Sequence, residues 1–244
     1  MRRVLFILFA VAVLAFPALA IWIIHPPALF DTVEARRASL PQRLAEQNVA
    51  MGQPLFIRIF KESSELEMWM KAEGKWRLFA SYEICKWSGR LGPKLKMGDK
   101  QAPEGFYEVR LSSLNPNSRW HLSFNLGFPN KFDRAHGRTG SFLMVHGGCS
   151  SAGCYAMTNP AVDDIYRLTE AALNGGQGFV PVHIFPFRMT NEAMWARAGN
   201  KWFKFWQNLK KGYDAFEETR VPPPVKVAGK QYVIGAALTA VENQ

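Results

Sequence analysis

The stretch HGGCSSAGCYAMTN, residues His146 to Asn159, carries a histidine and two of the three cysteines in the chain. An apolar segment, SFLMVH, leads into it, and the Asn159-Pro160 pair that closes it is typical of a helix start. The stretch is therefore expected to form a turn between a strand and a helix. Its residue types fit a metal site, a disulfide, a reactive thiol beside a base, or a turn without chemistry.

A metal site is the weakest of these interpretations, and neither a metal nor another cofactor is expected. His146, Cys149 and Cys154 offer three zinc-type ligands, but the remaining histidines are scattered singly and provide no fourth ligand nearby. Two disulfides remain open. Cys149 can pair with Cys154 in a small loop, or with Cys85 at the end of a predicted strand, which would leave Cys154 free.

A cysteine acyl-transfer site fits the spacing best. His146 ends an apolar strand, Gly147 and Gly148 allow a sharp turn, and Ser151 to Gly153 bring the Cys154 thiol back toward the imidazole. An imidazolium stabilises a thiolate, and the same ring can later protonate a leaving amine. Main-chain N–H groups of Gly153, Cys154 and Tyr155 could face a developing oxyanion. The alternative is a lone thiol buried in an apolar turn.

The N-terminus predicts export. Arg2 and Arg3 precede an uncharged run from Val4 to Ile24, which contains small residues at the spacing of a signal-peptidase site. The 21-residue run is also about 31 Å long as a helix, enough to span a bilayer. A signal peptide and a membrane anchor are both open, so the protein is expected in the periplasm, soluble or anchored to the inner membrane. The net charge of +10 favours anionic envelope material over nucleic acid as a partner.

The pattern along the chain predicts a mostly β fold of the α+β class, a sandwich or barrel with attached helices rather than a doubly wound sheet. One helix is expected over Ala161 to Leu173, and the basic, aromatic helix Arg197 to Lys211 is expected to pack on the sheet rather than on a membrane. The predicted strands are 54–62, 65–71, 76–87, 105–111, 121–126, 141–146 and 179–185. The chain is expected to divide into a signal or anchor segment (1–24), a linker (25–52), a strand-rich domain (53–187) and a helical extension with an extended tail (188–244). The linker is expected to contain a short helix near Arg43 to Val49. In the helical extension, Thr190 and Asn200 are possible helix caps.

Several segments together resemble the L,D-transpeptidase (YkuD-type) catalytic domain, and in particular its YafK-like murein branch. VHG at 145–147 and SAGCYAM at 151–157 are similar to the histidine-glycine and S-x-G-C motifs of that family. GDKQAPEGFYEV at 98–109 is similar to the family segment that precedes the active site. The segments ICKWSGRLGPK, FPNKFDRAHG and FPFRMT match the branch, so the resemblance covers about residues 52–220.

The resemblance implies a β-sandwich enzyme that acts on peptidoglycan stem peptides containing diaminopimelate, with residues 53–187 as its catalytic domain. Cys154 would attack the peptide carbonyl, His146 would be the general acid and base, and an amine would resolve the thioester. An envelope lipoprotein is a possible acceptor or substrate. Gly147 would help to orient the imidazole, and Ser151, Gly153 and Tyr155 would support the oxyanion. The rivals are an L,D-carboxypeptidase or endopeptidase, in which water resolves the acyl-enzyme, and a non-catalytic envelope-binding module.

The sequence departs from the family pattern close to the cysteine. Ala152 stands where a histidine is common, Ala156 stands where an arginine is common, and the eight-residue separation of His146 and Cys154 is short. Recognition of a substrate carboxylate therefore needs another cation. The candidates from charge and position are Arg134, His136 and Arg188.

Overall fold

The computed structural model describes residues 39–235. The chain divides into two compact units, residues 1–39 and 40–244, and the description below concerns the second. The predicted signal or anchor segment and the first half of the predicted linker, residues 25–38, lie outside the described residues. Within residues 39–235, no helix is long and apolar enough to cross a membrane.

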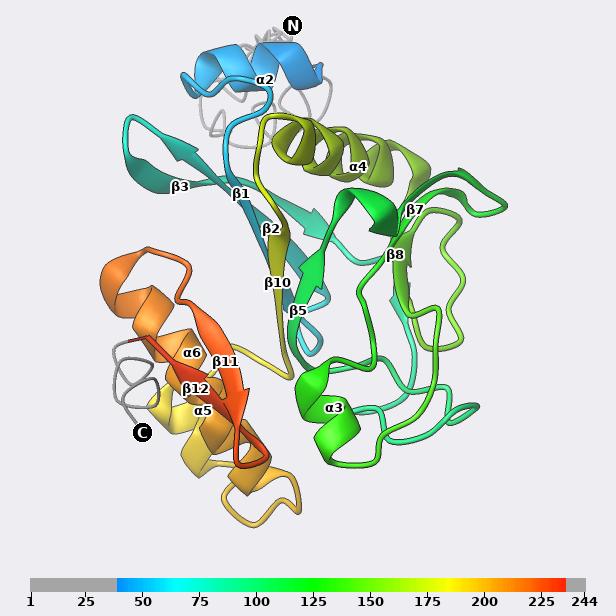
Figure 1. Cartoon of the computed structure of the whole chain (residues 1–244), viewed down its shortest axis with the longest axis vertical. Coiled ribbons are helices and arrows are strands. Elements are labelled where there is room, and N and C mark those ends of the chain that lie inside the picture. Colours follow the sequence, from blue (N-terminus) through cyan, green and yellow to red (C-terminus); the bar gives the residue numbers. More distant parts are fainter. Residues whose placement is uncertain (1–38, 236–244) are drawn as a thin grey trace, which may run out of the picture. The chain divides into compact units, whose positions relative to one another are not determined.

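The first of two five-stranded sheets has the strand order β3-β2-β1-β10-β5 (Figure 1). β1, β2 and β3 form an antiparallel meander, as the period-two alternation predicts. β10 joins the sheet parallel to β1 and carries β5 as an antiparallel edge strand. The strands are β1 (Leu55–Phe60), β2 (Glu65–Ala72), β3 (Lys75–Glu83), β5 (Gly105–Val109) and β10 (Val180–Phe185).

The second sheet has the order β4-β9-β8-β7-β6 and contains the stretch on which the sequence analysis centred. β8 pairs with β9 in parallel and with β7 in antiparallel fashion. Its strands are β4 (Lys86–Trp87), β6 (Leu114–Ser118), β7 (His121–Asn125), β8 (Met144–His146) and β9 (Tyr155–Ala156). β6 and β9 were not predicted. Two-residue β9 is too short to have a period, and the second sheet holds it in place.

The main hydrophobic core lies between the inner faces of the two sheets and the helix α4 (Asn159–Asn174). Ile57 of β1, Val182 of β10, Val145 of β8 and Tyr155 of β9 are all fully buried in this core. α4 begins where the sequence predicts, because the Thr158 hydroxyl accepts a hydrogen bond from the Ala161 N–H. The mostly β, α+β fold class is therefore confirmed.

The outer face of the first sheet is covered by the C-terminal extension. The helix α6 (Phe203–Thr219) buries Trp206, Leu209 and Phe216, so the basic, aromatic segment packs on the sheet as expected. α5 (Asn191–Trp195) has the predicted cap, Thr190, whereas the residue before α6 is Trp202 and not Asn200. The predicted extended tail forms a hairpin of β11 (Val225–Ala228) and β12 (Gln231–Ile234).

Three predicted boundaries are wrong in detail. The strand predicted over 76–87 is two strands in different sheets, because the chain leaves the first sheet after Glu83 and joins the second at Lys86. The strand predicted over 141–146 begins only at Met144. The short helix α2 (Leu40–Glu46) lies about one turn before its predicted position. A 3-10 turn, η2 (Leu111–Ser113), and the short helix α3 (Lys131–Ala135) complete the described elements.

Candidate active site

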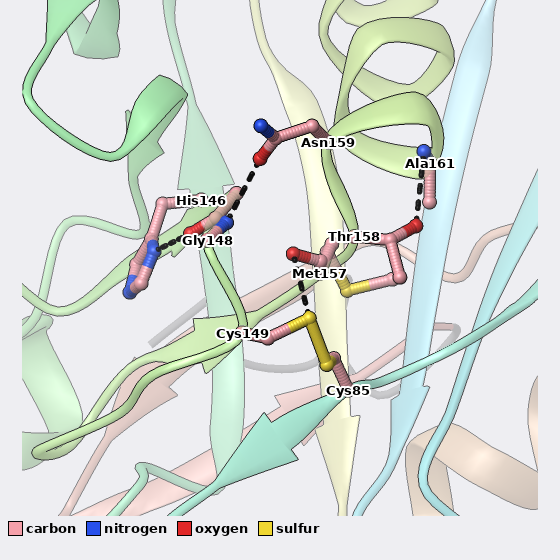
Figure 2. Close-up of a disulfide and its surroundings, with 9 residues drawn as sticks. Cys85, His146, Gly148, Cys149, Met157, Thr158, Asn159 and Ala161 are labelled. Carbon is pink, nitrogen blue, oxygen red and sulfur yellow. Dashed lines mark hydrogen bonds between the residues drawn. A yellow bond between two sulfur atoms is a disulfide. The ribbon is translucent and has the colours of Figure 1, made fainter.

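His146 is held in one orientation by its own turn. The residue ends β8 and is only 3% exposed, and its Nδ1 lies 2.6 Å from the carbonyl oxygen of Gly147 (Figure 2). A carbonyl can only accept a hydrogen bond, so Nδ1 carries the proton and the lone pair of the neutral ring is on Nε2. Burial lowers the pKa of His146, while the bond to Gly147 opposes this shift. The ring is therefore a neutral proton acceptor at neutral pH.

The sheet register brings Cys154 next to the strand that ends at His146. Val145 lies opposite Tyr155 in the parallel β8–β9 pair, and both side chains point into the core. His146 pairs with Ala156, and Cys154 is the residue directly before β9, so the thiol and the imidazole come from two segments that the β8–β9 pair holds side by side. The Cys154 Sγ lies 3.6 Å from the carbonyl oxygen of Phe142, and the thiol is partly exposed.

A disulfide joins Cys85 and Cys149, which leaves Cys154 as the free thiol (Figure 2). This is one of the two pairings that the sequence left open. The bond ties the segment between β3 and β4 to the turn that follows His146, across a separation of 64 residues. The turn is fixed further by the Gly148 N–H, which donates to Asn159 Oδ1 over 3.0 Å.

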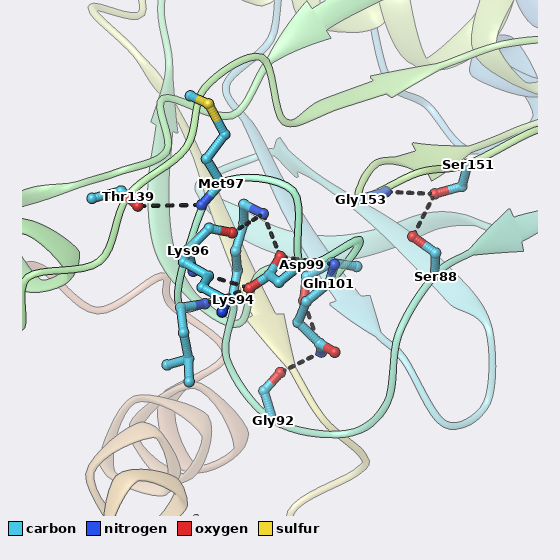
Figure 3. A network of polar contacts seen from close by, with 12 residues as sticks. Ser88, Gly92, Lys94, Lys96, Met97, Asp99, Gln101, Thr139, Ser151 and Gly153 are labelled. Carbon is cyan, nitrogen blue, oxygen red and sulfur yellow. Dashed lines mark hydrogen bonds and ion pairs between the residues drawn. The ribbon is translucent and has the colours of Figure 1, made fainter.

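The turn that presents Cys154 depends on Ser151 and Gly153. The Ser151 hydroxyl donates to the Cys154 carbonyl over 2.7 Å and lies 3.2 Å from the Ser88 hydroxyl. Gly153 has a φ of +132°, and a Cβ added there would lie 3.0 Å from a Leu143 methyl group. Its N–H donates to Ser151 Oγ over 3.3 Å (Figure 3). The Gly153 N–H therefore braces the turn in this structure.

Tyr155 and Gly147 contribute through their main chains. The Tyr155 side chain is buried in the core, where its hydroxyl donates to the Pro103 carbonyl over 2.6 Å. Only its N–H could face an oxyanion on the opposite side of the sheet. A Cβ at Gly147 would lie 2.6 Å from Asn159 Oδ1, so glycine is needed for the close approach of the turn to α4.

Lys94 is a feature of the site that the sequence analysis missed. Burial raises the pKa of Cys154, whereas the Met144 N–H and the positive charge of Lys94 lower it. Lys94 is 4% exposed, and its ammonium binds the Lys96 carbonyl at 3.0 Å and Asp99 at 2.5 Å (Figure 3). The only sequence signal was its place in the branch segment ICKWSGRLGPK.

Each of the three cations proposed for carboxylate recognition has a partner in the structure. Arg188 is bound by Glu65 and Glu67 of β2, each at 2.8 Å, and its guanidinium lies over the ring of Phe60. His136 follows α3, and its Nδ1 lies 2.9 Å from the Phe132 carbonyl. Arg134 lines a separate cavity and donates to the Pro129 carbonyl.

No cluster of three or more metal-ligating side chains exists within residues 39–235. Two exposed aromatic side chains lie beside the candidate pair. The Trp120 ring lies 5.9 Å from the His146 ring, and Phe142, whose carbonyl contacts Cys154, is 70% exposed. The site is thus a free thiol and an oriented neutral imidazole, with apolar surface next to them.

Comparison with known proteins identifies the class. The model of the L,D-transpeptidase catalytic domain (YkuD) matches residues 60–184. The chain belongs to this family. It is 48% identical over 189 residues to the Escherichia coli K12 protein named "Putative L,D-transpeptidase YafK". The aligned region covers 78% of this chain and 77% of that protein. The relative from Escherichia coli O157:H7 has the same identity and coverage.

Solved structures with a related arrangement are more distant. The helical cell shape determining protein Pgp2 from Campylobacter jejuni, as its K307A mutant, aligns with a TM-score of 0.46 and 20% identity, over 73% of this chain and 63% of that chain. Bd1075 from Bdellovibrio bacteriovorus aligns with a TM-score of 0.41 and 16% identity, over 76% and 83% of the two chains.

Proposed function

We propose that the protein is an exported cysteine acyltransferase that rearranges peptide bonds of peptidoglycan stem peptides. One observation carries the proposal: Cys154 is the free thiol, and it directly precedes the strand that pairs with the end of β8, where the Nδ1–H of His146 is bound to the Gly147 carbonyl. Membership of the L,D-transpeptidase family supports the stem peptide as the substrate.

The proposed reaction starts from a neutral pair. Burial raises the pKa of the Cys154 thiol and lowers the pKa of His146, so proton transfer accompanies attack rather than preceding it. The sulfur bonds to the scissile carbonyl carbon, and its proton moves to His146 Nε2. The tetrahedral intermediate then loses the terminal D-amino acid as an amine, which takes the same proton, and a thioester remains on Cys154.

An acceptor amine resolves the thioester in the second half of the reaction. The amine attacks the thioester carbonyl, His146 takes its proton, and the Cys154 thiolate leaves and recovers a proton. Water in place of the amine gives a carboxypeptidase or endopeptidase. Position 156 is an alanine, and Lys94 supplies a nearby positive charge instead of an arginine there. This charge favours the thiolate form of Cys154.

We propose further that the enzyme acts outside the cytoplasm. The segment 1–24 has the composition of a signal peptide or anchor. The Cys85–Cys149 disulfide supports the same compartment, since structural disulfides persist in oxidising surroundings such as the periplasm. A lipoprotein of the envelope is then a possible acceptor or substrate.

The test is incubation of the purified protein with disaccharide-tetrapeptide, followed by intact-mass analysis and separation of the products. An adduct on Cys154 with cross-linked dimers supports the transpeptidase, and trimmed monomers identify the hydrolase. Cys154→Ala should abolish both products, and His146→Gln should lower the acylation rate by at least about 100-fold. A folded protein that never forms an adduct on Cys154 contradicts the proposal and leaves a binding module.

A further inference from the structure

A large cavity among the described residues lies on the outer face of the first sheet. Its volume is about 820 Å³, within the range of binding sites for small molecules and peptides. Its lining residues come from β5 and β10, from α3 and from the segment before the β11–β12 hairpin. Phe106, Phe179 and the three prolines 222–224 give it an apolar lining.

The rim of this cavity is cationic. Lys131 and Arg134 lie three residues apart on α3, and therefore on one face of the helix. Neither has an acidic partner within residues 39–235; Arg134 donates only to a main-chain carbonyl, and Lys131 has no ion pair. Glu108 is the acidic residue of the lining, and it is already paired with Arg110 at 2.6 Å. The rim therefore offers two cations to an anion.

One residue that lines the same cavity carries a buried polar atom without a hydrogen-bond partner. His183 of β10 lines the cavity and is 2% exposed, and its Nδ1 makes no hydrogen bond. Burial and the charge of Arg58 lower the pKa of His183 to about 3, so the ring is neutral. An unpaired buried polar atom is costly, and most such atoms in proteins are hydrogen-bonded. Phe56 and Phe106 enclose the ring at centroid distances of 4.8 Å and 4.4 Å.

The wall of the cavity is also part of the candidate active site. Leu126, which lines the cavity, donates its N–H to the Leu143 carbonyl over 2.9 Å. Leu143 directly follows Phe142, whose carbonyl contacts the Cys154 sulfur. One hydrogen-bonded pair of segments therefore connects the lining of the cavity to the segment that contacts the thiol.

We infer that this cavity is a second binding site, which holds a carboxylate-bearing stem peptide through Lys131 and Arg134 and hydrogen-bonds one of its amides at His183. A neutral glycan would leave the two cations unused, and an acyl chain would leave His183 unpaired. A stem peptide supplies carboxylates, amides and apolar side chains together. The identity of the ligand rests on the proposed function, whereas the existence of the site rests on the geometry.

The test uses the full chain with Cys154→Ala, labelled with ¹⁵N-histidine, and a soluble stem tetrapeptide as the probe. Each ring signal is assigned by a histidine-to-glutamine variant. Because burial lowers the pKa of His183 to about 3, a shift of its Nδ1 resonance at neutral pH reports a new hydrogen bond rather than a protonation. The His146 signal reports occupancy of the catalytic turn in the same sample.

In the double variant Lys131→Gln/Arg134→Gln, the tetrapeptide concentration that half-saturates the His183 shift is expected to rise by at least about tenfold. The matched control Lys71→Gln/Lys75→Gln makes the same charge change on exposed residues of β2 and β3 and should leave the affinity within twofold. Tetrapeptide with amidated carboxylates should bind as weakly as the double variant.

The outcomes separate this inference from the proposed function. A His183 resonance that stays unchanged up to millimolar tetrapeptide overturns the second site, whether or not His146 responds. A His183 shift that the double variant leaves intact also overturns it. Conversely, a cation-dependent His183 shift in a protein whose wild type forms no Cys154 adduct keeps the site and removes the acyltransferase.

Discussion

Replacing Lys61 by methionine tests how the loop beside the candidate site is held. The Lys61 ammonium is fully buried and donates to the carbonyls of Arg90, Gly92 and Ala102 at 2.8, 3.0 and 3.0 Å. It also pairs with Glu104 Oε1 at 3.0 Å. Burial lowers the pKa of Lys61, and Glu104 opposes this shift. Four contacts of one ammonium thus close residues 90–104 over the end of β1.

The expected cost follows from what the substitution leaves behind. Glu104 is 0% exposed and would keep only the Gly92 N–H at 2.6 Å and the Trp206 indole at 3.0 Å as partners. Removal of one partner of a buried ion pair costs about 3–5 kcal/mol, since the other charge stays buried. For a domain of this size, that loss lowers the melting temperature by roughly 6–20 °C.

The assay is denaturant and thermal unfolding of the full chain, followed by circular dichroism. Lys61→Met/Glu104→Gln should recover part of the loss, because no uncompensated charge remains. Lys71→Met, an exposed lysine of β2, should change the unfolding free energy by about 0.5 kcal/mol or less. A loss below about 1 kcal/mol for Lys61→Met, or a double variant that is simply the sum of the two single variants, would refute the reasoning.

Three further predictions concern the cysteines. The alkylation rate of Cys154 in the absence of reductant should rise with pH, with a midpoint above the usual thiol pKa of about 8.5, because burial raises the pKa of Cys154. A rate that reaches its plateau below pH 7 would instead show a thiolate–imidazolium pair. Lys94→Met should lower the alkylation rate at pH 7 and move the midpoint upward, because the positive charge that lowers the pKa of Cys154 is lost. Lys96→Met, which changes an exposed lysine of the same loop, should do neither, and equal effects of the two variants would exclude a specific role of Lys94. Cys85→Ser/Cys149→Ser should reduce the unfolding free energy by about 2–4 kcal/mol in denaturant titrations, and an unchanged midpoint would contradict the contribution of the disulfide.

The sequence by itself predicted the elements that have long, regular patterns. Alternation over 54–71 predicted β1 and β2, and the Asn159-Pro160 pair with the apolar spacing behind it predicted α4. The motifs around His146 and Cys154 predicted the family, which the match to residues 60–184 confirms. Such signals are local, because they depend on residues that are neighbours along the chain.

Tertiary structure decided what depends on distant residues. The free state of Cys154 follows from the pairing of Cys149 with Cys85, 64 residues away, and two equally plausible pairings looked alike in the sequence. Charge and position alone selected Arg188, but Glu65 and Glu67 of β2 bind it, whereas buried Lys94, which the sequence did not single out, lowers the pKa of Cys154 through its charge. Burial and the field of a charge are set by the packing of both sheets, so composition and spacing locate a reactive residue more readily than they reveal its surroundings.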